Sequence, residues 1–163
     1  MPLETLDDLF LHELRDLHDA ERQNVAGLQY FAQAATAQPL RELFEAHLKE
    51  TQEHLKRLDE VFRELGEKPE GRTCRAMQGL LAEGRELLDE DIDPDVLDAA
   101  LVLAAQKIEH YEIAAYGSLA TFARELGYRH AGPLLHTTLE EEIGADRKLT
   151  REAERRINRN AEA

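Results

Sequence analysis

Helix-breaking residues gather at four points of this 163-residue chain, around residues 38–39, 66–71, 91–94 and 127–133. Between these points Ala, Leu, Glu and Arg dominate, and these residues are strong helix formers. Cutting the chain at the breakers predicts five helices, over residues 3–37, 40–65, 74–90, 95–126 and 131–158. Four of these helices are long and the third is short. The chain is therefore expected to be all-α.

The lengths of these helices and of their connections restrict how they can pack. At about 1.5 Å per residue the long helices span roughly 40–50 Å, so they can pack only side by side. The links after the first and the fourth helix are very short and predict two antiparallel hairpins. Residues 67–94, with the short helix, connect the hairpins. This is the connectivity of a ferritin-like four-helix bundle, and residues 1–163 are expected to form a single domain.

The charge of the chain excludes several classes of partner. The sequence holds 34 Asp and Glu against 20 Lys and Arg, a formal net charge of −14 at pH 7. Nucleic acids and anionic membranes would repel such a chain. With 42% hydrophobic and 33% charged residues it is too apolar for a disordered acidic chain and too polar for a membrane span. The single Cys74 and the plain Met1–Glu4 start favour a reducing cytoplasm.

Each long helix carries a carboxylate on or near its apolar stripe, where Leu would be the usual occupant. At about 100° per residue these acids interrupt the inward face of their helices, and only Glu50 lies toward an edge. Counting from the two hairpin turns at about 1.5 Å per residue puts them all at one height. The carboxylates are therefore expected to converge inside the bundle: Glu21, Glu50, Glu109, Glu112, Glu142 and Asp146.

The negative charges of carboxylates that converge inside a bundle need positive charges to balance them. In a low-dielectric core they would repel one another, at a cost of several kcal/mol for each unpaired ion, and no Lys or Arg faces inward at that height. Two divalent cations would balance them, and carboxylate and imidazole donors without a thiolate suit Fe or Mn. We therefore predict two Fe ions, with Mn as the alternative. The competing interpretation is that single glutamates, Glu50 above all, extend to water as boundary residues.

Two histidines also face inward, one turn on either side of Glu50. His47 and His54 can each be a metal ligand, a partner that orients a carboxylate, or a core histidine, and His47 is the stronger candidate. The remaining histidines are expected at the surface or in an interface: His12, His18, His110, His130 and His136.

Four further residues have simpler expected roles. Tyr116 lies one turn beyond Glu112, where it can hydrogen-bond a ligand or simply fill the core, and filling the core is the favoured role. Glu140 and Glu141 belong to a charge run, which usually forms a solvated face. Cys74 opens the short helix and is expected to be structural.

Residues 107–117 (KIEHYEIAAYG), followed by LGY at 126–128, resemble the YciE/YciF family of ferritin-like bacterial stress proteins. Residues 46–51 (AHLKET) and 139–142 (LEEE) share this resemblance, and residues 74–80 (CRAMQGL) are similar to the crossover segment of the family. The resemblance covers nearly the whole chain. It implies a ferritin-like fold with a di-metal centre, homodimers and a role in stress responses.

The sequence departs from the wider rubrerythrin and ferritin pattern, in which a Glu on one helix faces Glu-x-x-His on its partner. Glu53 stands where a His would follow Glu50, so His47 or His54 would substitute. The last helix likewise has Ala145 in place of a His. This carboxylate-rich set differs from the ligands of a ferritin-type oxidase.

The sequence thus predicts a di-iron carboxylate protein that reacts with O2 or peroxide inside a helical bundle. One alternative is a metal-binding or scaffold stress protein without catalysis. Another is disproportionation of peroxide, as in manganese catalases. No catalytic residue beyond the metal ligands is assigned, and the expected partners are a second copy of the chain and a small oxidant.

Overall fold

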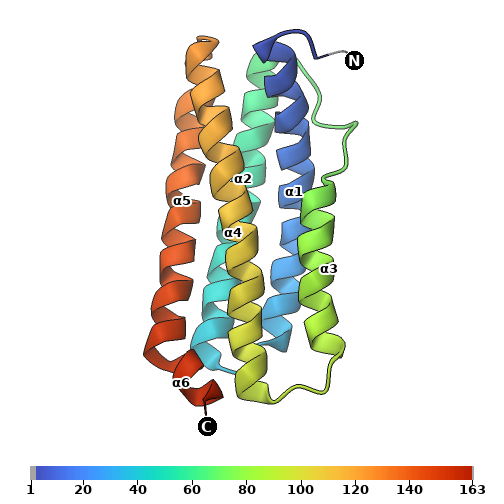
Figure 1. The fold of residues 1–163 in the computed structure, drawn as a ribbon. Coiled ribbons are helices and arrows are strands. Elements are labelled where there is room, and N and C mark those ends of the chain that lie inside the picture. The colour runs from blue at the N-terminus through green and yellow to red at the C-terminus, as the bar shows by residue number, and fades with distance from the viewer. Residues whose placement is uncertain (1–2, 163) are drawn as a thin grey trace.

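The computed structural model describes residues 3–162 (Figure 1). Residues 1, 2 and 163, which include the start of the Met1–Glu4 segment and both ends of the expected domain, lie outside the described part. The described chain forms α1 (Leu6–Ala34), α2 (Gln38–Leu65), α3 (Arg75–Asp89), α4 (Pro94–Glu125) and α5 (Ala131–Glu152). A π-helical turn (Ala153–Ile157) and α6 (Asn158–Ala161) follow. The all-α prediction is confirmed.

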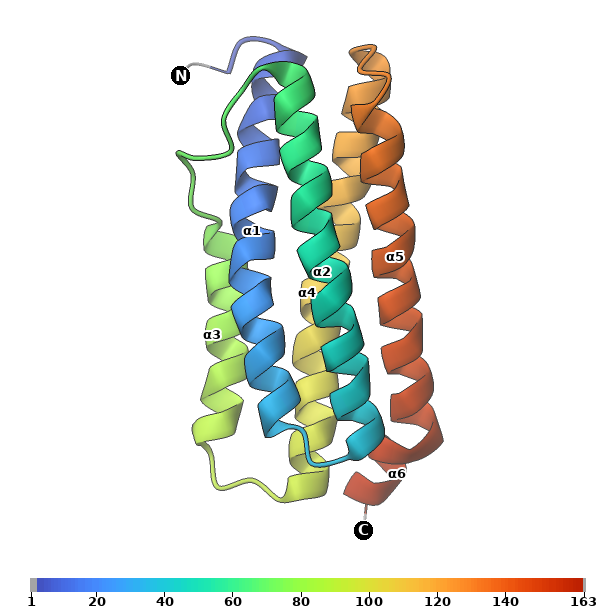
Figure 2. The same ribbon diagram turned by 180° about the vertical axis from the view of Figure 1, so that it is seen from behind.

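The four long helices enclose one core. α1 and α2 form one antiparallel hairpin, and α4 and α5 form the other (Figure 1). The hairpins pack through α1 against α4 and through α2 against α5. The connection from α2 returns along the whole bundle, and its helix α3 packs outside on α1 and α4 (Figure 2). This is the predicted ferritin-like four-helix bundle, with a short fifth helix on the crossover.

The first helix begins three residues later than predicted because Thr5 caps it. The Thr5 hydroxyl accepts the Asp8 N–H at 3.1 Å, and the Asp8 carboxylate accepts the Thr5 N–H at 2.9 Å. This capping box satisfies donors that the first turn would otherwise leave unpaired. The second helix begins at Gln38, earlier than predicted, since Pro39 in its first turn needs no N–H partner.

The first helix also ends earlier than predicted, at Ala34 instead of residue 37. The buried Asp98 of α4 holds the turn that follows, accepting the Thr36 N–H at 2.7 Å and the Ala37 N–H at 2.8 Å. The break between α1 and α2 is therefore fixed by a residue about 60 positions away in the sequence.

The predicted last helix is interrupted near its end. Residues Ala153–Ile157 form a π-helical turn, in which the Asn158 N–H bonds to the Ala153 carbonyl. Both Ala153 and Ile157 remain buried.

Gly66 and Gly127, with φ of 68° and 78°, follow α2 and the end of α4 in the left-handed conformation that favours glycine.

Small residues let α3 approach α1 closely. A Cβ on Gly27 would overlap Cδ2 of Leu81.

Cys74 caps α3, with its Sγ accepting the Met77 N–H at 3.4 Å, and burial raises the pKa of this thiol to about 11. The predicted structural role of Cys74 is therefore confirmed.

The helices that the structure describes are too short or too polar for a membrane crossing.

Candidate metal centre

Buried polar side chains from all four long helices meet in the middle of the bundle. Every one of them is at least nine-tenths buried. The set comprises Glu21 and Asn24 of α1, His47, Thr51 and His54 of α2, Glu109, Glu112 and Tyr116 of α4, and Glu142 of α5. Four of the six predicted acids therefore lie in the interior, together with both inward-facing histidines.

The donor atoms form two adjoining clusters. In the first, one ligand atom each of His47, Glu109, Glu112 and Glu142 lies within 4.8 Å of the others. In the second, the same holds for Glu21, His54 and Glu142.

Glu142 is shared by the two clusters. Its Oε2 lies 3.3 Å from His47 Nε2, and its Oε1 lies 2.9 Å from His54 Nδ1. Each oxygen thus faces a different cluster. A carboxylate in this position can bridge two metal ions, as glutamates do in di-metal bundles.

Two carboxylates outside the clusters orient the histidines. Glu50 Oε2 lies 3.1 Å from Nδ1 of His47, and Glu141 Oε2 lies 2.9 Å from Nε2 of His54. The pKa values of both carboxyls are lowered, that of Glu50 chiefly by His47 and that of Glu141 by Arg57 and His54 against the effect of burial. Because ionised carboxylates only accept hydrogen bonds, these outer nitrogens donate. A carboxylate behind a histidine is the usual second layer of a metal site.

Many inward-facing atoms that could ligate a metal have no hydrogen-bond partner among residues 3–162. They are Glu21 Oε2, His47 Nε2, His54 Nδ1, Glu109 Oε2 and both oxygens of Glu142. The two histidine nitrogens lie near carboxylates but are not aligned for hydrogen bonds. Unpaired buried polar atoms cost roughly 1–3 kcal/mol each, so native proteins hold few of them. Nitrogen and oxygen donors without a thiolate fit Fe or Mn. This buried His and Glu group can therefore hold metal.

The pKa values show how the site would be charged without cations. Burial raises the pKa of Glu109 to about 8 and, together with repulsion from Glu21 and Glu142, raises that of Glu112 well above 4.5. Burial lowers the pKa of His47, but Glu109 and Glu142 outweigh it and raise the value well above 6.5.

The second histidine behaves similarly. Burial lowers the pKa of His54, but the nearby carboxylates of Glu142 and Glu21 outweigh it and raise the pKa to about 10. The two protonated histidines in turn lower the pKa of Glu142 against the effect of its burial. Protons therefore take the place of cations in the metal-free cluster, and binding of metal would release them.

Two of the predicted acids lie outside both clusters. Glu50 is half-buried and pairs with His47 and, at 3.5 Å, with Lys148. Asp146 accepts a hydrogen bond from Gln106 at 3.1 Å, one turn of α5 beyond Glu142. The helical wheel placed Asp146 on the inward face together with Glu142, but a step of four residues rotates it by about 40° from Glu142, and its side chain contacts Gln106.

Two side chains hold candidate ligands: sequence reasoning gave the bond of Tyr116 only as an alternative to core filling, and it missed Asn24. Asn24 Nδ2 lies 3.2 Å from each oxygen of Glu112, and the Tyr116 hydroxyl donates to Glu21 Oε1 at 2.5 Å. Tyr116 fills the core as predicted but also makes this bond. Asn24 lies three residues after Glu21, on the same face of α1, and that spacing could have revealed it.

The solvent exposure of the acidic run on α5 was predicted correctly for one of its two residues, Glu140 and Glu141. Glu140 is exposed as expected, but the assignment of Glu141 to a solvated face is wrong. Glu141 is half-buried between His54 and Arg57, whose Nη2 lies 2.9 Å from Glu141 Oε1. The helical period of α5 places Glu140 opposite the buried stripe and Glu141 at its edge, and the partners that cover Glu141 lie on α2.

Comparisons with known proteins agree with this architecture. Residues 5–162 match the family model described as the domain of unknown function DUF892. The chain is 45% identical to protein YciF of Escherichia coli strain K12, over 99% of this chain and 98% of YciF. The crystal structure of the E. coli stress protein YciF matches with a TM-score of 0.92 and 44% identity, covering 96% of this chain and 99% of that one.

A second solved structure, named YcfI, from Rhodopseudomonas palustris, has a TM-score of 0.87 and 46% identity over 90% of this chain and 94% of that one. The resemblance seen in the sequence is thereby confirmed. The chain belongs to the DUF892 family, together with the stress protein YciF.

Proposed function

We propose that this protein is a di-metal carboxylate stress protein whose bundle holds two ions, most simply iron, and reacts with O2 or peroxide. The observation that carries the proposal is the convergence of unpartnered donor atoms on two adjoining clusters with a shared Glu142. Membership of a family that includes a stress protein supports a protective role.

The candidate ligands have distinct tasks in this proposal. His47, Glu109 and Glu112 would hold one ion, Glu21 and His54 the other, and Glu142 both. One ion would then have three ligand residues of its own and the other would have two, and each would share Glu142. This number of ligands leaves coordination positions for a reactant. When bound, the metal pair supplies the electrons that reduce the oxidant.

The surrounding side chains keep the ligands in place. The Asn24 amide fixes both oxygens of Glu112, and Glu50 and Glu141 fix the two imidazole rings. Burial and the nearby acids raise the pKa of Tyr116 well above 10, so its hydroxyl stays protonated and donates its hydrogen bond to Glu21 Oε1. These bonds favour a single arrangement of the donors, which lowers the cost of reorganisation.

Anaerobic loading with ferrous ions tests the redox function. On addition of O2 or peroxide, a near-ultraviolet absorption of ferric iron should develop. Asp146→Asn, outside both clusters, should retain the absorption, and Glu142→Gln should abolish it. If loaded iron stays ferrous in the wild type, the redox function is wrong. Loading with Mn and measuring O2 release from peroxide tests the manganese alternative.

A structural role for the metal is the second candidate. The two clusters draw one or more ligands from each of the four long helices, so ions there would tie the bundle together. In that case chelation should lower the melting temperature sharply while no turnover is found.

Location and assembly complete the proposal. A reducing cytoplasm is consistent with Cys74, whose thiol is free and buried. The resemblance to the family supports the proposal of a homodimer, and sedimentation tests the oligomeric state in solution.

A further inference from the structure

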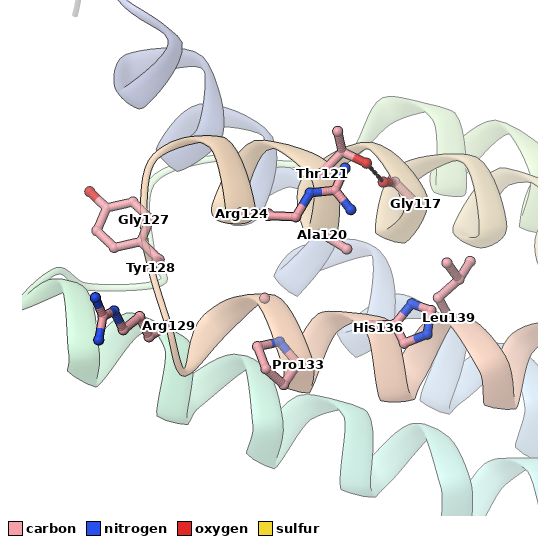
Figure 3. A pocket seen from close by; sticks show the side chains of 11 residues that line it. Gly117, Ala120, Thr121, Arg124, Gly127, Tyr128, Arg129, Pro133, His136 and Leu139 are labelled. Atoms are coloured by element: carbon pink, nitrogen blue, oxygen red, sulfur yellow. Dashed lines mark hydrogen bonds between the residues drawn. The ribbon is translucent and has the colours of Figure 1, made fainter.

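A small cavity leads from the surface to one side of the candidate metal centre. It has a volume of about 220 Å³ and lies between α2 and α5. His47 and Glu109 form part of its wall. A hollow of about 520 Å³ at the α4–α5 turn, flanked by Arg124 and His136, does not touch either cluster (Figure 3).

The exposure of the candidate ligands agrees with this opening. His47 is 6% exposed and Glu109 is 1% exposed, while the other four candidate ligands, Glu21, His54, Glu112 and Glu142, are 0% exposed. The two ligands with any access to solvent are thus the two that line the cavity. The centre is therefore open on this side only, as far as the described residues show.

The walls of the cavity favour an uncharged occupant. Buried Phe44, Ala145 and Leu149 form its inner part beside His47 and Glu109, and exposed Ala46 and Lys148 belong to its outer part. An ion would lose its hydration between these apolar side chains at a cost of several kcal/mol. The volume is also below the roughly 300–1,000 Å³ of sites for drug-sized ligands.

At the outer part, the two charged side chains among the described lining residues compensate each other. Lys148 Nζ lies 3.5 Å from Glu50 Oε1, and both residues line the cavity. The pair adds little net charge to the mouth, so an uncharged molecule meets no electrostatic barrier there.

We propose that this cavity is the path by which a small uncharged molecule, of the size of O2 or hydrogen peroxide, reaches the candidate metal centre. The purpose of the path rests on the proposed function, but its existence does not.

Xenon tests the cavity in metal-free protein, because it occupies dry apolar cavities. Crystals under xenon pressure should show an atom beside Phe44 and Ala145. Ala145→Leu should remove it, whereas Ala120→Leu, which fills the separate hollow of Figure 3, should leave it in place. A wild-type cavity without xenon would overturn the proposal, whether or not the protein binds metal.

Nitric oxide, a small uncharged probe, tests the path in ferrous-loaded protein. Ala46→Leu and Ala145→Leu should slow its binding by roughly tenfold or more, because passage must now displace a close-packed side chain. Metal content should not change, and Ala120→Leu should bind at the wild-type rate. Wild-type rates in both cavity variants would overturn the path. If the wild type holds no iron, the proposed function fails, and the xenon experiment alone decides on the cavity.

Discussion

Replacing Glu109 by Gln should make the metal-free protein more stable at pH 7. Burial raises the pKa of Glu109 from 4.5 to about 8, so the folded protein at pH 7 keeps a proton that the unfolded chain releases. At about 1.36 kcal/mol per pKa unit, the 2.5 units between 4.5 and 7 correspond to about 3 kcal/mol. Gln needs no proton, and its amide oxygen can still face His47 Nε2, which lies 3.0 Å from Glu109 Oε1.

The raised pKa of Glu109 also predicts how the difference in stability between the two proteins changes with pH. For a carboxyl with a raised pKa, the contribution to stability is complete below pH 4.5 and is lost as the pH rises through about 8. Urea unfolding of metal-free wild type and Glu109→Gln should therefore coincide near pH 4, diverge up to about pH 8 and stay parallel above it. An offset that is equal at every pH, or a less stable variant at pH 7, would refute the reasoning.

Metal should reverse the order of the two proteins. At 1,000 times its Kd a ligand stabilises a folded protein by about 4.1 kcal/mol, which exceeds the advantage of about 3 kcal/mol of the metal-free variant, and Glu109→Gln, which lacks one donor, should gain far less. Glu140→Gln, an exposed neighbour of the cluster residues on α5, serves as the control and should follow the wild type with and without Mn. A variant that gains as much from Mn as the wild type would remove Glu109 from the ligands.

Two further predictions concern the fold. Gly27→Ala should destabilise the protein and lower its melting temperature. The added methyl group gains roughly 1 kcal/mol in helix propensity, but its overlap with Leu81 costs about 1–3 kcal/mol. Gly79→Ala, with open space around it, should instead raise the melting temperature. Asp16 accepts hydrogen bonds from Tyr111 and Arg72, which lower its pKa below 3.8 against the effect of burial. Asp16→Asn should therefore lose about 1–3 kcal/mol at pH 7, and the deficit should shrink as the pH falls below 3.8 in urea unfolding.

The fold and the buried acids were predictable because both depend on the period of one helix at a time. The apolar stripe of each long helix defines its inward face, and Glu21, Glu109, Glu112 and Glu142 lie well within those faces. The connections then fix which helices are neighbours. No knowledge of a neighbouring side chain is needed for either step.

The roles at the edge of the cluster were not predictable in the same way, because they depend on contacts between helices. His54 pairs with Glu141, 87 residues away, and Asn24 with Glu112, 88 residues away. A helical wheel gives a direction but not the partner that lies there. Glu50 and Asp146 differ from the cluster residues of their helices by a fraction of a turn.

Metal content tests the central claim most directly. Protein produced with ample iron and manganese, then freed of loosely bound ions, should retain about two ions per chain, as di-metal bundles do. Glu142→Gln should lose most of both ions, since Glu142 belongs to both clusters, while Asp146→Asn should keep them. Wild-type protein without metal, or a Glu142→Gln variant with the full content, would contradict the account.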